Sequence, residues 1–265
     1  MMKKLSCCLF ALALGLSLTG FCDSEFTKTL NAAQQNAVES QYCLAIMYAT
    51  GEGVARDYVL AAQWLEKAAG QGHAQAQYNL GTMYYRGDGV TQDYALAAKW
   101  WEKAAERGDT QAQCNLGVLY MHGRGVAQDY ALAARWYEQA AEQGDAQAQC
   151  NLGILYVVGQ GVTQDYGLAV QWYEKAAQQG HAQAQYNLGV MYHAGNGVTQ
   201  NYALSVKWWE KAAEQGDMQA QYSLGTMYDR GDGVAQNNAL AVKWWEKAAN
   251  QGHEDARLVL QSRGR

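Results

Sequence analysis

Proline is absent from this 265-residue chain, and phenylalanine occurs only three times. No cluster of basic residues is present, and the only long apolar run lies at the N-terminus. Without proline, the turns must be made by the 28 glycines, which lack a Cβ. Lysine and arginine alternate with glutamate along the same segments, so we expect no nucleic-acid partner. No segment after residue 18 is continuously apolar, so we expect no integral membrane segment.

The N-terminus differs in composition from the rest of the chain. Residues 1–4 carry the positive charge of Lys3 and Lys4, residues 5–18 are apolar, and residues 19–23 are small and polar apart from Phe21. This order predicts a secretory signal peptide over residues 1–22 and export to the periplasm or beyond. A lipoprotein acylated at Cys22 is the alternative, but Phe21 occupies a position where that signal requires a small residue. Loss of Lys3 and Lys4 with the signal would make the formal net charge more negative than −5.

A block of 36 residues is then written six times without an insertion. Such a block can bury its apolar face only against the blocks beside it, so the repeats predict one elongated array. We expect terminal cap helices over 23–37 and 254–265. The six repeats are 38–73, 74–109, 110–145, 146–181, 182–217 and 218–253.

Each block predicts two helices. In the second block, residues 74–85 place Leu80 and Met83 on one face, and residues 94–107 have an apolar arc of about 200°. Asp93 and Asp109 are expected to cap helix N-termini, and Gly108 to end a helix in the left-handed conformation. The glycine at position 81 predicts a close helix contact with the bulky tryptophan of the second helix. That tryptophan is expected in the column Trp64, Trp100, Trp136, Trp172, Trp208 and Trp244.

Three of the six cysteines follow the predicted signal, and an odd number cannot be fully paired in disulfides within one chain. Cys114 and Cys150 occupy a column that holds tyrosine in other blocks, at a spacing beyond disulfide reach. We interpret both as apolar replacements for tyrosine.

The block pattern A-x-A-Q-x-x-L-G-x-x-Y-x-x-G-x-G-V-x-x-[DN]-x-x-x-A-x-x-W-x-x-x-A-A-x-x-G resembles the Sel-1-like repeat, a relative of the tetratricopeptide repeat. The resemblance implies an α/α solenoid adaptor that holds protein partners. A cysteine-rich bacterial branch is linked to β-lactam binding or hydrolysis, but the paired cysteines of that branch are missing here.

The sequence contains no convincing catalytic, cofactor or metal motif. Ser205 and Lys207 have the wrong spacing for a serine β-lactamase, and His253 lacks the second histidine of a zinc protease motif. His73, His181 and His253 share a helix-capping column and are too far apart along the array to share a metal. We therefore predict no catalytic residue, no metal and no cofactor.

A polar stripe on the first helices is the predicted binding site. Stacked amides can bind the backbone of an extended peptide, a use that the resemblance to tetratricopeptide-type solenoids also implies. Solvation of an exposed helix face is the alternative. A second set, which differs most between blocks, could select the partner. The stripe comprises Asn79, Asn115, Asn151, Asn187 and Ser223 with Gln75, Gln111, Gln147 and Gln183, and the variable set comprises Tyr85, Arg86, His122, His193 and Arg230.

A further glutamine column lies on the apolar side of the first helices. We expect these side chains to satisfy buried backbone groups and to be structural. They are Gln41, Gln77, Gln113, Gln149, Gln185 and Gln221.

Together these features predict an all-α, right-handed α/α superhelical solenoid of six helix-turn-helix repeats with capping half-repeats. We expect an exported, non-enzymatic scaffold that binds a protein or peptide on its concave face, as a monomer or weak oligomer. An envelope enzyme acting on a β-lactam or cell-wall material is the alternative from another class. A purely structural spacer is the third possibility.

Overall fold

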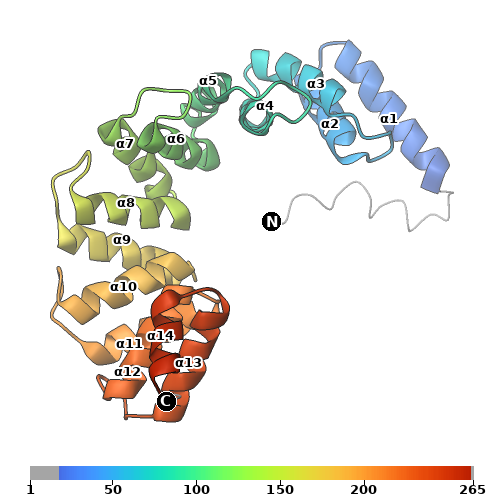
Figure 1. Cartoon of the computed structure of the whole chain (residues 1–265). Coiled ribbons are helices and arrows are strands. Elements are labelled where there is room, and N and C mark those ends of the chain that lie inside the picture. The colour runs from blue at the N-terminus through green and yellow to red at the C-terminus, as the bar shows by residue number, and fades with distance from the viewer. Residues whose placement is uncertain (1–17, 264–265) are drawn as a thin grey trace. The chain divides into compact units, whose positions relative to one another are not determined.

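The computed structural model describes residues 18–263, and the regular secondary structure in that range is entirely α-helical (Figure 1). Each repeat block contributes two helices, with one further helix before the first block and one after the last. In chain order these are α1 (Leu18–Gln34), α2 (Val38–Thr50), α3 (Tyr58–Gly70), α4 (Ala74–Arg86), α5 (Tyr94–Ala105), α6 (Thr110–His122), α7 (Tyr130–Glu142), α8 (Ala146–Val158), α9 (Tyr166–Gln178), α10 (Ala182–Ala194), α11 (Tyr202–Glu214), α12 (Met218–Arg230), α13 (Asn238–Asn250) and α14 (Glu254–Arg263).

The helices form two compact units that meet in sequence at Gln128 and Asp129. Within the first unit, each helix from α1 to α6 packs against the next one along the chain. The same neighbour-to-neighbour packing runs from α7 to α14 in the second unit. The predicted all-α solenoid of helix pairs is therefore confirmed.

Helix α1 begins at Leu18, so it contains the predicted signal boundary after residue 22. Residues 1–17 of the predicted signal lie outside the described part of the chain, and the signal peptide stays a prediction. Between residues 18 and 263, none of the helices has the length and apolar character needed to cross a bilayer.

Helix capping follows the sequence prediction closely. The Asp93 carboxylate accepts from the backbone N–H groups of Ala95 and Leu96 at 2.9 Å, and Asp109 accepts from Ala112 at 2.8 Å. Gly108 is left-handed with φ of +86°, as predicted. Side chains therefore satisfy amide groups that the first turn of a helix leaves without partners.

The loop between the two helices of a block packs on the preceding block. A Cβ added to Gly89 would lie 2.2 Å from the carbonyl oxygen of Tyr58, so only glycine fits at this position. Gln92 then donates to the carbonyl of Tyr85 at 2.9 Å. The same glutamine bond recurs at Gln128, Gln164, Gln200 and Gln236.

The buried aromatic column differs from the predicted one. Trp100 is half-buried, with the ammonium of Lys103 4.2 Å above its ring, whereas Trp101 is only 3% exposed. A Cβ on Gly81 would lie 2.6 Å from Trp101, so the predicted close contact exists but involves the next residue along the chain. The fully buried column is Leu65, Trp101, Tyr137, Tyr173, Trp209 and Trp245.

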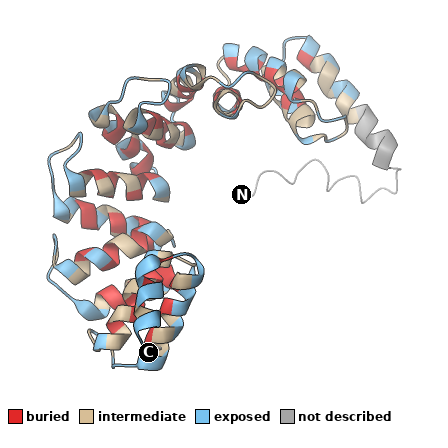
Figure 2. Ribbon diagram, in the orientation of Figure 1, coloured by how far each residue is buried: buried red, intermediate tan, exposed pale blue. Residues whose placement is uncertain are grey.

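The buried glutamines satisfy backbone groups, as predicted, and these bonds also join one block to the next. Gln185 donates to the carbonyl of Ala177 at 3.1 Å and accepts from Gln215 at 2.7 Å. In the second block, Arg107 occupies the position of that second glutamine, and the buried Oε1 of Gln77 accepts no hydrogen bond. Figure 2 shows buried residues on the facing sides of the helices and exposed residues in the loops.

Candidate functional site

The predicted polar stripe lies on the exposed side of the first helices. The glutamines of the stripe are exposed, and its asparagines and serine are half-buried. Within each compact unit, the asparagines therefore form the inner part of a polar surface that the glutamines flank. The half-buried members are Asn79, Asn115, Asn151, Asn187 and Ser223; the exposed members are Gln75, Gln111, Gln147 and Gln183.

Glutamine and asparagine one turn apart are hydrogen-bonded to each other. Gln147 donates to Asn151 at 3.0 Å, and Gln183 donates to Asn187 at 3.1 Å. A carboxamide has two donor hydrogens and an oxygen that accepts two bonds. Each pair therefore retains donor and acceptor capacity for a ligand while the bond within the pair restricts both side chains.

Neighbouring blocks are also linked across this surface. The Tyr78 hydroxyl donates to Gln111 at 3.0 Å, and Asn79 donates to the Tyr42 hydroxyl at 3.4 Å. In the second unit, burial raises the pKa of the Tyr173 hydroxyl above its usual value, and the Asn187 side chain opposes that shift only partly. These bonds hold the polar surface in place before any ligand binds, which lowers the entropy lost on binding.

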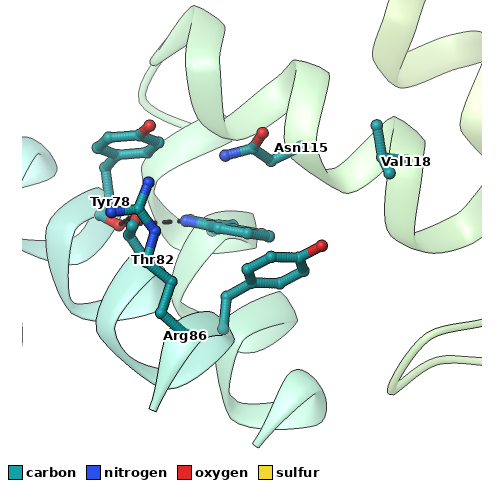
Figure 3. A pocket seen from close by; sticks show the side chains of 7 residues that line it. Tyr78, Thr82, Arg86, Asn115 and Val118 are labelled. Carbon is teal, nitrogen blue, oxygen red and sulfur yellow. Dashed lines mark hydrogen bonds between the residues drawn. The ribbon is translucent and has the colours of Figure 1, made fainter. Parts of the chain in front are cut away.

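A hollow of about 190 Å³ opens on the first unit beside this surface. Tyr78, Thr82, Tyr85 and Arg86 of α4 line one side. Trp101 of α5, with Asn115 and Val118 of α6, completes the lining. Figure 3 shows the side chains of Arg86 and Asn115 entering the same hollow from different helices.

Aromatic side chains form the floor of this hollow. The indole N–H of Trp101 donates to the carbonyl of Tyr78 at 3.1 Å, so the polar edge of the indole is already satisfied. The Tyr85 ring lies 5.3 Å from the Trp101 ring, and the hydroxyl of Tyr85 accepts from Arg124 at 3.3 Å. Tyr85, Arg86 and Asn115 are predicted binding residues, whereas Trp101 is not, because the repeat pattern indicated the column of Trp100 for the core position.

The other variable positions have different surroundings. The His193 ring lies 5.5 Å from Trp209 and 5.2 Å from Tyr202. His122 and Arg230 are exposed at the ends of α6 and α12. The structure therefore distributes the variable set along the chain and places only Tyr85 and Arg86 at the hollow.

Groups with catalytic potential are buried or dispersed. Burial raises the pKa of the Cys150 thiol to about 12, which leaves it protonated at neutral pH. The hydroxyl of Ser205 is fully buried and donates to the carbonyl of Gly189 at 2.7 Å. Within residues 18–263, no three histidine, cysteine or acidic side chains are grouped closely enough to hold a metal ion.

Two-helix blocks that pack only on their neighbours define an α/α repeat protein. The Sel1 repeat matches this chain at residues 38–73, 74–109, 110–145, 146–181, 182–217 and 219–253. The chain therefore belongs to the Sel1 repeat family, whose members are protein-interaction scaffolds with a typically non-enzymatic fold.

Two solved structures are similar to this chain. A protective antigen of uropathogenic Escherichia coli with a Sel1-like fold is 40% identical, with a TM-score of 0.83 over 87% of this chain. This chain spans 50% of the length of that antigen. A Sel1 repeat protein from Oxalobacter formigenes is 31% identical, with a TM-score of 0.71 over 88% of this chain and 97% of its own. Among curated proteins, none matches the chain.

Proposed function

We propose that this protein is an exported, non-enzymatic scaffold that binds an extended segment of a partner protein through the amides of its first helices. The observation that supports this proposal most is the recurrence of a half-buried asparagine at one position of four successive first helices. An extended peptide presents backbone N–H and C=O groups at regular intervals, and carboxamides complement both groups. Family membership supports a protein partner.

Replacement of Asn115, Asn151 and Asn187 together by alanine tests the amide surface. A partner is first captured from an envelope extract with the full-length protein and identified by mass spectrometry. At about 1 kcal/mol per lost hydrogen bond, we expect the triple variant to bind the purified partner about 3 kcal/mol more weakly. Isothermal titration calorimetry measures the difference, and circular dichroism should show unchanged helicity.

The chain supplies a matched control in the same three blocks. Arg135, Gln171 and Lys207 are exposed on the second helices α7, α9 and α11. Their joint replacement by alanine should leave partner affinity unchanged. Equal affinity of the asparagine variant and the wild type for the partner would disprove binding by the amide surface.

Export is proposed from the composition of residues 1–22, with signal cleavage near residue 22. Intact-mass measurement of the protein purified from the envelope fraction tests this proposal. Recovery of the uncleaved chain from the cytoplasm alone would contradict it.

A further inference from the structure

The hollow above Trp101 has the size and lining of a site for one side chain. Its volume of about 190 Å³ corresponds to roughly six water molecules at their share of liquid volume. The rings of Tyr78, Tyr85 and Trp101 and the methyl groups of Thr82 and Val118 supply its apolar lining, and polar groups supply a similar share. An apolar side chain placed there would leave water, and it would not bury an unsatisfied indole N–H, because Trp101 already donates to the carbonyl of Tyr78.

The rim of the hollow is positively charged although the protein carries a net negative charge of −5. Arg86 ends α4, is exposed, and forms no ion pair with any of the described residues. Arg124 lies next to the lining residue Tyr85 and donates to its hydroxyl. Two guanidinium groups beside a hollow that is partly lined by aromatic rings complement an apolar side chain that has a carboxylate next to it.

The other blocks lack this combination. The position of Arg86 holds Thr50, His122, Val158, Ala194 and Arg230 elsewhere. Arg230 is the only other arginine, and its neighbour at the position of Tyr85 is Asp229, which pairs with Arg263. A carboxylate would therefore meet an acidic side chain beside Arg230, whereas it would meet a tyrosine beside Arg86.

We infer that the hollow above Trp101 binds an apolar side chain of the partner protein and that Arg86 binds a carboxylate adjacent to it. This inference rests on the proposed function, because the occupant is part of the extended segment that the amides bind. Asn115 belongs to both sites, since it lines the hollow and is a member of the amide stripe. The hollow thus sets the position of the segment, and the amides bind the backbone that continues from it.

A set of short peptides tests the inference on the full-length protein. The probe is fluorescein-Gly-Asp-Phe-Asp-Gly-amide, which has a carboxylate on both sides of its apolar residue. One comparison peptide has asparagine in place of both aspartates, and another has alanine in place of phenylalanine. Fluorescence anisotropy measures the dissociation constants, and the ¹⁵N-indole signal of Trp101, assigned with Trp101→Phe, reports where the peptide binds.

We expect Arg86→Gln to weaken binding of the aspartate peptide at least about tenfold, the size of one charge-assisted hydrogen bond. Binding of the asparagine peptide should not change. Arg230→Gln is the matched control and should leave both affinities unchanged. Val118→Trp, which fills the hollow, should weaken binding of both phenylalanine peptides and leave the Trp101 signal insensitive to them.

Three results would overturn the inference: no binding of the aspartate peptide to the wild-type protein, equal effects of Arg86→Gln and Arg230→Gln, or a Trp101 signal that the bound peptide does not move. The proposed function is judged separately, by the asparagine variant and the captured partner. A partner that needs Asn115, Asn151 and Asn187 but tolerates Arg86→Gln would disprove the side-chain site and leave the scaffold proposal in place.

Discussion

Single histidines in this chain act as helix caps, and this role depends on their protonation state. The Nδ1 atom of His181 accepts from the backbone N–H of Ala184 at 3.3 Å, and Nε2 lies 3.2 Å from the amide oxygen of Gln147. This pattern requires a neutral ring with its hydrogen on Nε2. Burial lowers the pKa of His181 below 6.5, and the nearby Asp145 opposes that shift only partly.

The lowered pKa predicts a loss of stability in weak acid. The unfolded chain binds a proton at His181 more readily than the folded chain does, so the stabilisation is present above pH 6.5 and is lost as the pH falls through the lowered folded-state pKa. Aspartate caps the same position in three other blocks, where Asp109, Asp145 and Asp217 accept at 2.7–2.8 Å. When the pH falls from 7.5 to 5.5, we therefore expect the free energy of unfolding to decrease less in His181→Asp than in the wild type. The difference between the two decreases should be about 0.5–1 kcal/mol, which is the usual contribution of a helix cap.

Urea denaturation at the two pH values measures this difference. His122→Asn is the control, because His122 is exposed at the end of α6 and caps no helix N-terminus. It should retain the pH sensitivity of the wild type. Equal losses in the wild type and His181→Asp would show that the cap does not titrate in this range.

At the scale of the element, the sequence predicted the helix pairs but not which aromatic residue joins them. The apolar arc of the second helix spans about 200°, so Trp100 and Trp101 both lie within it. One residue must face the first helix of its own block and the other a neighbouring block, and a pattern of apolar residues does not distinguish these directions. The glycine at position 81 was the informative signal, because it lies directly against the ring of Trp101.

The amide stripe was predictable for a related reason. Its residues recur at one position of a regular helix, and their position on the polar face follows from the helical period. The hollow was not predictable, because it forms from three helices and depends on Trp101 being the buried residue. Its charge also depends on Arg86 lacking an acidic partner, which only the folded arrangement determines.

The first block suggests a test of the helix pair. There, Ala45 replaces the glycine and Leu65 replaces the tryptophan, so a larger residue on one helix accompanies a smaller one on the other. Gly81→Ala alone should destabilise the protein by about 1–3 kcal/mol, because the new Cβ would lie 2.6 Å from Trp101. With Trp101→Leu also present, we expect the alanine to cost nothing or to stabilise, because it favours the helix and its clash is gone.

A double-mutant cycle in urea measures the coupling, which we expect to be about 1–3 kcal/mol. Gly70→Ala is the control, because no atom lies within 4 Å of the added Cβ and its φ is not positive. That change should stabilise the protein by about 0.4–1 kcal/mol. Additive effects of Gly81→Ala and Trp101→Leu would contradict a direct steric contact.

At the scale of the whole molecule, each described helix within a compact unit packs mainly on the helices next to it in sequence. Trp209 illustrates this range. Its indole lies against Gly189 and donates to the carbonyl of Tyr186, both in α10, and its cluster includes Leu224 and Met227 of α12. The energetic effect of such a residue should therefore extend over adjoining helices and decrease beyond them.

Trp209→Ala tests this locality. Removal of the indole should destabilise its neighbourhood by about 3–5 kcal/mol, the usual range for a large buried aromatic residue. We expect amide hydrogen exchange to accelerate strongly in α10, α11 and α12 and to stay unchanged in α2 and α3, which belong to the other unit. Trp208→Ala should accelerate the same amides less, because Trp208 is half-buried. An equal loss of protection from α2 to α13 would instead mean that the chain opens as one cooperative body, because a neighbour-by-neighbour array transmits the loss of one side chain only through its adjoining interfaces.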